Sequence, residues 1–127
     1  MMNSALTVNK HIYGILSSDE RLCKMVDRKN MFPIVAEENA KFPMIVFNRD
    51  AVQVEYTKDG VADDLCQFTV NCYAKNYTQT VDALQRVREL LELRCDGYFR
   101  RVTITAMDEE WNDNVYHQSL TFTCIIN

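Results

Sequence analysis

The chain has 127 residues, of which 47% are hydrophobic, and its 14 Lys and Arg against 18 Asp and Glu give a formal charge of -4. This length and apolar content suit one domain over residues 1–127, because two domains would each lack a sizeable core. The sequence pI of about 5.1, without a dense basic stripe, argues against nucleic acid as a partner. The chain has only 3 Gly and 2 Pro, and no Gly-rich phosphate-binding motif occurs in it. Nucleotide binding through such a loop is therefore excluded.

Apolar runs and cysteine usage indicate the cellular compartment. The longest purely apolar run, residues 44–47, is far shorter than the ~20 residues of a membrane helix, so no membrane partner is expected. The first residues lack the pattern of a secretory signal, which predicts a cytoplasmic location. The cysteines form no Cys-x-x-Cys pair, so we expect reduced core residues and no zinc or other cofactor. They are Cys23, Cys66, Cys72, Cys95 and Cys124.

Two helices are predicted at the start of the chain. The first begins near Thr7, because four apolar residues recur at helical spacing and would form one buried stripe: Val8, Ile12, Ile15 and Leu16. Ser17 and Glu20 have the spacing of a capping box, which predicts a second helix over residues 19–26.

Extended segments follow these helices. Pro33 cannot donate a ladder hydrogen bond, so residues 31–36 are expected at a sheet edge, with an acidic loop over 37–41. Residues 44–47 are apolar on both alternating faces, which indicates a strand covered on both sides.

The same strand is expected to continue as a half-exposed ribbon through Val52, Val54 and Tyr56. A turn at residues 58–60, where Gly60 accepts positive φ, joins it to a strand over 65–74. The core face of that second strand should carry Cys66, Phe68, Val70 and Cys72.

A long helix is predicted from residue 76 to residue 94, with Asn76 and Gln79 as its capping pair. Its apolar stripe comprises Val81, Leu84, Val87 and Leu91. On its wet face, Asp82 with Arg86 and Arg88 with Glu92 have the spacing of i,i+4 ion pairs.

A second hairpin spans residues 102–126, with the polar segment 108–114 as its loop. The predicted order is therefore α-α-β-β-β-α-β-β. It describes an α+β domain with a mainly antiparallel sheet of about five strands and helices packed on one face.

Few residues offer catalytic chemistry. His11 and His117 are the only imidazoles, and no nucleophile motif accompanies either, so packing or exposure is favoured over a functional role for each. Cys66 and Cys72 lie about 20 Å apart along a strand, too far for a disulfide. We therefore predict no catalytic residue and no enzyme activity.

The acidic run 108–113 has two interpretations. Its carboxylates suit a hard cation, although EF-hand spacing is absent and a solvated hairpin loop is favoured, so no metal site is predicted. Trp111 within it is either a lid folded onto the core or an anchor for a partner's pocket.

Opposite charges are concentrated in two parts of the chain. A cluster of arginines comprises Arg86, Arg88, Arg94, Arg100 and Arg101, and the acidic cluster comprises Asp108, Glu109 and Glu110. In a head-to-tail ring, one patch on each subunit meets a different patch on its neighbour, and opposite charges favour such a contact. Our hypothesis is that these two clusters form that contact. The alternative is that the charges are scattered over the surface without a partner.

Several short strings, in this order, resemble the tail-completion or tail-terminator proteins of phages with long non-contractile tails. The strings are Ile12 to Leu16, then Ser18, Asp19 and Leu22, then Phe32, Pro33 and Ala36, then Pro43 to Phe47, then Gln67 to Ala74, and finally Tyr77 with Leu84, Val87 and Leu91. The likeness covers roughly residues 7–95, and none of the strings is catalytic.

The resemblance implies a virion protein that forms a ring, of six copies by analogy, at the head-proximal end of the tail tube. Its partners would be itself, the tail tube protein and a head-completion protein, and it would occupy the virion after assembly in the bacterial cytoplasm. By the same analogy the first hairpin tip is expected at an interface, through Thr57, Lys58, Asp59, Gly60, Asp63 and Asp64.

Two alternatives remain open from the sequence. One is a head-tail neck adaptor of the same particle, which differs in the partner it meets. The other is a small-ligand-binding or enzyme domain that uses His117 with the carboxylates of residues 108–113.

Overall fold

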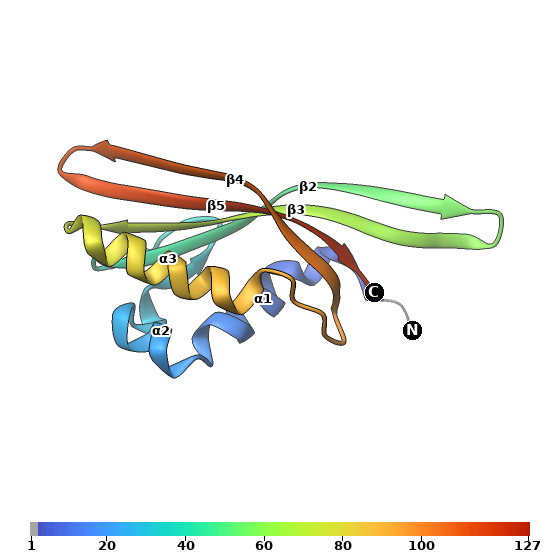
Figure 1. Ribbon diagram of the computed structural model, residues 1–127, viewed down its shortest axis with the longest axis horizontal. Coiled ribbons are helices and arrows are strands. Elements are labelled where there is room, and N and C mark those ends of the chain that lie inside the picture. The colour runs from blue at the N-terminus through green and yellow to red at the C-terminus, as the bar shows by residue number, and fades with distance from the viewer. Residues whose placement is uncertain (1–2) are drawn as a thin grey trace.

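The computed structural model describes residues 3–127 and shows one five-stranded sheet with the helices on one of its faces (Figure 1). Along the chain lie η1 (Ala5–Thr7), α1 (Val8–Ser17), α2 (Glu20–Met25), η2 (Arg28–Asn30), β1 (Met31–Pro33), β2 (Met44–Thr57), β3 (Gly60–Ala74), α3 (Tyr77–Leu91), β4 (Phe99–Asn112) and β5 (Val115–Ile126). The strand order is β1-β2-β3-β5-β4, with β1 parallel to β2 and the other pairs antiparallel. The predicted α+β class is confirmed.

The core lies between the helices and the centre of the sheet. The predicted core face of β3 is confirmed, because Cys66, Phe68, Val70 and Cys72 are all fully buried. The Phe68 ring stacks on two rings from other strands, with its centroid 5.0 Å from that of Phe122 and 6.0 Å from that of Phe99. These aromatic contacts join β3, β4 and β5 beneath the helices.

The cap of α2 differs from the predicted one. Asp19, not Ser17, accepts the hydrogen bond from the Leu22 backbone N–H, at 2.9 Å. The hydroxyl of Ser17 instead donates to the carbonyl of Tyr13 inside α1. The last turn of the first helix therefore uses the hydroxyl that a capping box would need.

Helix α3 begins after Asn76, which caps the Gln79 N–H as predicted, but it ends at Leu91 rather than at residue 94. Its buried stripe is rotated from the predicted one, since Thr80 is fully buried and Val81 is 39% exposed. Burial of Thr80 is possible because its hydroxyl donates to the carbonyl of Tyr77.

Of the two predicted ion pairs on α3, one is confirmed. Arg88 lies 2.8 Å from Glu92, whereas Arg86 pairs with Asp19 at 2.7 Å rather than with Asp82. Asp19 takes both guanidinium hydrogen bonds of Arg86, and a bidentate partner on the neighbouring helix is geometrically better than a single i,i+4 contact.

The two hairpins point in opposite directions, and the β2–β3 hairpin extends well past the helices, whereas the β4–β5 tip lies beside the start of α3 (Figure 1). The prediction of a loop over 108–114 is wrong, because residues 108–112 continue β4 and only Asp113 and Asn114 form the turn. Strand β3 likewise begins at Gly60 instead of residue 65. Residues 60–62 and 108–112 are all exposed, so no apolar alternation reveals the strands there.

Candidate functional site

The tip of the β2–β3 hairpin, residues 56–61, is built around a two-residue turn. Gly60 adopts a φ of +132°, as the turn prediction required, and pairs with Thr57 across the hairpin. The Thr57 hydroxyl accepts from the Asp59 N–H and donates to the Gly60 carbonyl. Lys58 therefore projects from a fixed turn, and it forms no ion pair with any residue in the range 3–127.

Two other residues predicted at this interface have partners inside the subunit. Asp63 accepts a hydrogen bond from Arg100 at 2.7 Å. Asp64 is only 9% exposed and accepts from the Ala5 backbone N–H at 2.9 Å. These contacts fix the base of the hairpin to the start of β4 and to the amino-terminal segment, which leaves residues 57–60 as the exposed part of the predicted surface.

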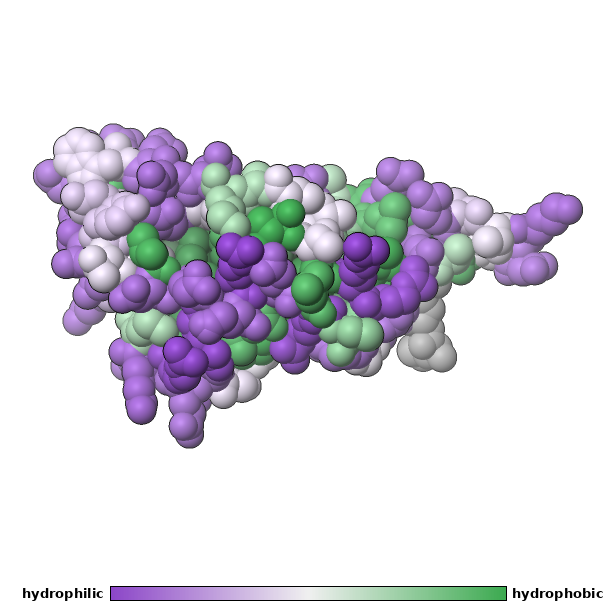
Figure 2. Space-filling model, viewed as in Figure 1, coloured by the Kyte–Doolittle hydropathy of each residue, from purple (hydrophilic) through white to green (hydrophobic). Residues whose placement is uncertain are grey.

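Apolar side chains that the sequence did not mark as a site lie along this hairpin and on the amino-terminal segment. They line a cavity of about 690 Å³ beside the amino-terminal segment. Its exposed apolar members are Leu6, Val52, Val54, Tyr56 and Val61. Figure 2 shows hydrophobic surface at the base of this hairpin and a hydrophilic end.

The tip of the β4–β5 hairpin, residues 109–118, holds a second surface. Asp113 and Asn114 both adopt positive φ, of 52° and 63°, which suits the two-residue turn of a hairpin and these two residue types. The resulting register places Trp111 opposite Tyr116. Trp111 is 57% exposed, so it is not the lid over the core that the sequence left open.

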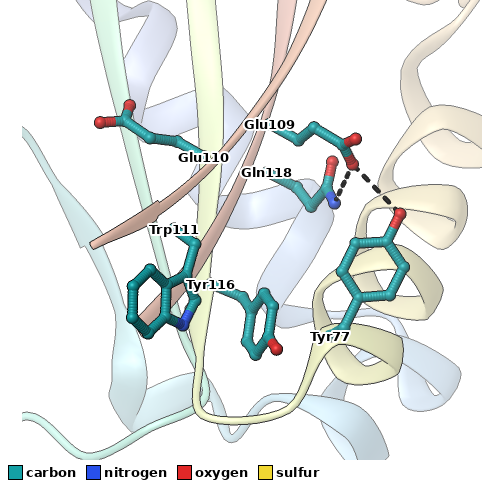
Figure 3. A pocket seen from close by; sticks show the side chains of 6 residues that line it. All are labelled: Tyr77, Glu109, Glu110, Trp111, Tyr116 and Gln118. Atoms are coloured by element: carbon teal, nitrogen blue, oxygen red, sulfur yellow. Dashed lines mark hydrogen bonds between the residues drawn. The ribbon is translucent and has the colours of Figure 1, made fainter. Parts of the chain in front are cut away.

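Trp111 instead lines a pocket of about 280 Å³, which we call the tip pocket (Figure 3). Its walls combine aromatic rings with carboxylates and an amide: Tyr77, Glu109, Glu110, Trp111, Tyr116 and Gln118. The Tyr77 and Tyr116 rings meet edge to face at 5.7 Å. Tyr77 comes from the first turn of α3, so the pocket joins the ribbon to the helical layer.

Glu109 is held in place inside the tip pocket. Its Oε2 accepts from the Tyr77 hydroxyl at 3.1 Å and from the Gln118 amide at 2.9 Å (Figure 3). The hydrogen bond to the carboxylate raises the pKa of Tyr77. Within residues 3–127 no donor is bonded to Oε1, so this oxygen of the carboxylate has no hydrogen-bond partner there.

On the opposite face of the same hairpin, His117 and Glu110 are brought together as the sequence allowed. The Nδ1 atom of His117 lies 3.9 Å from Glu110, and its Nε2 lies 2.8 Å from the Asn71 side-chain oxygen. Burial lowers the pKa of His117, and the Glu110 carboxylate opposes that shift. Tyr73 stacks on the imidazole at 4.3 Å, and a cavity of about 290 Å³ is lined by Tyr73, Glu110 and His117 together with Asn112 and Val115.

The arginine cluster of the sequence is dispersed in the structure. Arg86, Arg88, Arg94 and Arg100 each form an ion pair with an acid of the same chain. Arg101 forms none among residues 3–127, and it stands at the beginning of β4, while Asp108, Glu109 and Glu110 stand near its end. At about 3.3 Å per residue, Arg101 and the three acids are separated by roughly 23 to 30 Å along β4.

The other candidate groups are parts of the fold. His11 lies 3.3 Å from Asp96 and stacks on Tyr98, between α1 and the start of β4. Burial raises the pKa of Cys72 to about 12. Among residues 3–127 no group of three or more His, Cys, Asp or Glu side chains could hold a metal ion. No helix in that range is long and apolar enough to span a bilayer.

The geometry thus defines an α+β domain whose two ribbons extend from opposite ends of one sheet. Comparison with solved structures finds the same fold in a chain of the virion of a native gene transfer agent particle. The TM-score is 0.76 and the identity 13%, over 91% of this chain and 90% of that one. Comparisons with protein-family models and with curated proteins found no match.

Proposed function

We propose that this protein is a structural component of a phage or phage-like virion. In this proposal it forms a ring at the head-proximal end of the tail tube, ends tube growth and joins the tail to the head. It acts by binding other proteins, without catalysis. The observation that carries the proposal is the fold shared with a chain of a gene transfer agent virion over nine-tenths of both chains.

The distribution of surface features also supports a ring. Copies in a ring meet head to tail, so each subunit needs two different complementary surfaces. The β2–β3 tip with its exposed apolar base lies at one end of this sheet, and the tip pocket lies at the other. The free charges of Arg101 and of Asp108 also stand at opposite ends of β4.

Self-association is the direct test. Size-exclusion chromatography with light scattering should give the mass of a closed oligomer, six copies by the family analogy, and electron microscopy should show rings. Mixing with tail tube subunits should yield tubes of limited length. Protein that stays monomeric with and without tube subunits contradicts the proposal.

A neck adaptor of the same particle is the closest alternative role. The two roles differ in the binding partner, so copurification separates them. A tail terminator retains the tube protein, whereas an adaptor retains a portal-side protein and leaves tube length unchanged.

A ligand-binding role is favoured by one observation, the cavity that joins His117 to Glu110. Native mass spectrometry of the protein from its host tests this role directly. A bound small molecule that is lost in a His117→Ala variant would support it. An unliganded mass, with rings intact in that variant, would leave assembly as the function.

A further inference from the structure

We propose that the tip pocket binds the side-chain ammonium group of Lys58 from a second copy of this chain. The inference rests on the proposed ring, and it assigns the residues of one contact between neighbours. The ligand class follows from the pocket chemistry, and the particular cation follows from the charges that the chain leaves free.

The pocket is suited to a cation. Aromatic ring faces attract an ammonium group within about 6 Å of their centroids, and a nearby carboxylate adds charge attraction. Trp111, Tyr116 and Tyr77 supply the rings, and Glu109 supplies a carboxylate with an unused oxygen. Two hydrogen bonds already orient Glu109, so little side-chain entropy is lost when a cation binds.

The surroundings of the pocket select a cation over an anion. The hairpin that carries it has four acids, Asp108, Glu109, Glu110 and Asp113. No Lys or Arg occurs between Arg101 and the end of the sequence at residue 127. The acidic charge of the β4–β5 ribbon therefore has no compensating Lys or Arg within that ribbon.

Lys58 is the cation that the structure leaves available at the right place. It is the only Lys or Arg between residues 50 and 64, and it stands at the end of the ribbon that extends away from the tip pocket of its own subunit. Lys58 therefore reaches such a pocket only in another copy. Tyr56, which is 71% exposed, and Val61, which is 44% exposed, provide apolar contacts beside it.

The opposite directions of the two ribbons give this contact its symmetry. The β2–β3 tip of one copy meets the β4–β5 tip of the next, which is a heterologous contact and continues around a ring. Trp and Tyr side chains dominate such contacts when a partner covers them, and Trp111 and Tyr56 are both exposed in the single subunit.

Charge reversal with rescue tests the contact in the full chain. Lys58→Glu and Glu109→Lys should each lower the association constant, measured by light scattering over a dilution series, by about tenfold or more. The double variant should recover most of that loss. Lys10→Glu and Glu38→Lys, exposed residues outside residues 56–61 and 109–118, are matched controls and should associate like wild type.

A zero-length amine-to-carboxylate cross-linker supplies an independent measurement. In a mixture of isotopically light and heavy protein, peptide mass spectrometry should find Lys58 joined to Glu109 in mixed pairs. Rings that form normally in both reversed variants, without this cross-link, would overturn the pocket assignment and leave the ring itself standing. A wild-type protein that never self-associates would overturn both.

Discussion

Replacing Asp96 should destabilise the junction between α3 and β4. Its Oδ1 accepts the backbone N–H groups of Tyr98 at 2.8 Å and Phe99 at 2.6 Å, and its Oδ2 accepts from Arg94 at 2.6 Å. Phe99 is fully buried and Tyr98 is 7% exposed, so water does not readily replace the carboxylate. Each buried donor left unpaired costs about 1–3 kcal/mol.

Two variants separate the backbone contacts from the charge. Asp96→Ala removes all of these bonds, and we expect it to lower the free energy of unfolding by about 2–4 kcal/mol. Asp96→Asn keeps an oxygen for the two backbone donors but loses the charge that Arg94 and His11 face. We therefore expect it to lower the free energy of unfolding by only about 1 kcal/mol. Urea unfolding followed by circular dichroism, at one fixed protein concentration, measures both values.

The effect of the charge should depend on pH. Burial alone would raise the pKa of Asp96, but hydrogen bonds from Arg94, Phe99, Tyr98 and His11 outweigh it and hold that pKa far below its ordinary value. A lowered folded-state pKa stabilises the fold above the unfolded-state value near 4, and this stabilisation is lost as pH falls toward the folded-state value. The free energies of unfolding of wild type and Asp96→Asn should therefore become equal in acid. Equal stability of the two proteins at pH 7 would refute this account.

Three further results are expected. Phe68→Ala removes a fully buried ring that contacts two others, and it should lower the free energy of unfolding by about 3–5 kcal/mol in urea titrations. A thiol reagent should label the exposed Cys95 in the native protein, while Cys72, buried and with its pKa raised to about 12, should react only after unfolding. Trp111→Ala should weaken self-association in light scattering without changing the circular dichroism spectrum, because the indole is 57% exposed in the subunit.

The parts of the fold that were predictable are those in which burial alternates with exposure. The core face of β3 and the stripe of α1 carry period-two and helical patterns, and both are buried as expected except for Ile15 of α1, which is only partly buried. The turn at Gly60 could also be predicted from the sequence, because few residues other than glycine tolerate its φ of +132°. In these places one local rule decides the structure.

The errors occur where tertiary contacts compete with local patterns. The sequence offered Arg86 a partner four residues away, yet Asp19 on another helix accepts two of its hydrogen bonds. Residues 108–112 lack any apolar alternation, and they are a strand because β5 pairs with them. Hydrophobic periodicity reports burial, so it gives no signal for an edge strand that is wet on both faces.

The candidate site was predictable only in part. Lys58, Glu109 and Trp111 were chosen from the sequence as interface residues, but Tyr77 and Gln118 were not, since nothing local connects them to Trp111. Tyr116 carried a usable signal. Asp113 and Asn114 favour a two-residue turn, and such a turn places Trp111 and Tyr116 opposite each other.

The two ribbons also differ energetically from the rest of the molecule. Two-stranded hairpins without a covered face are marginally stable, and the β2–β3 hairpin beyond Asp64 is such a ribbon, whereas the β4–β5 tip pairs with β3 as far as Ala74 and lies beside α3. Tyr56 and Trp111 remain exposed on these ribbons, although burial of each aromatic ring would stabilise the protein. A neighbouring copy that covers both ends would stabilise them together. We therefore expect ring formation and the ordering of the hairpins to be coupled. The core of the single subunit determines only the directions in which the two hairpins point.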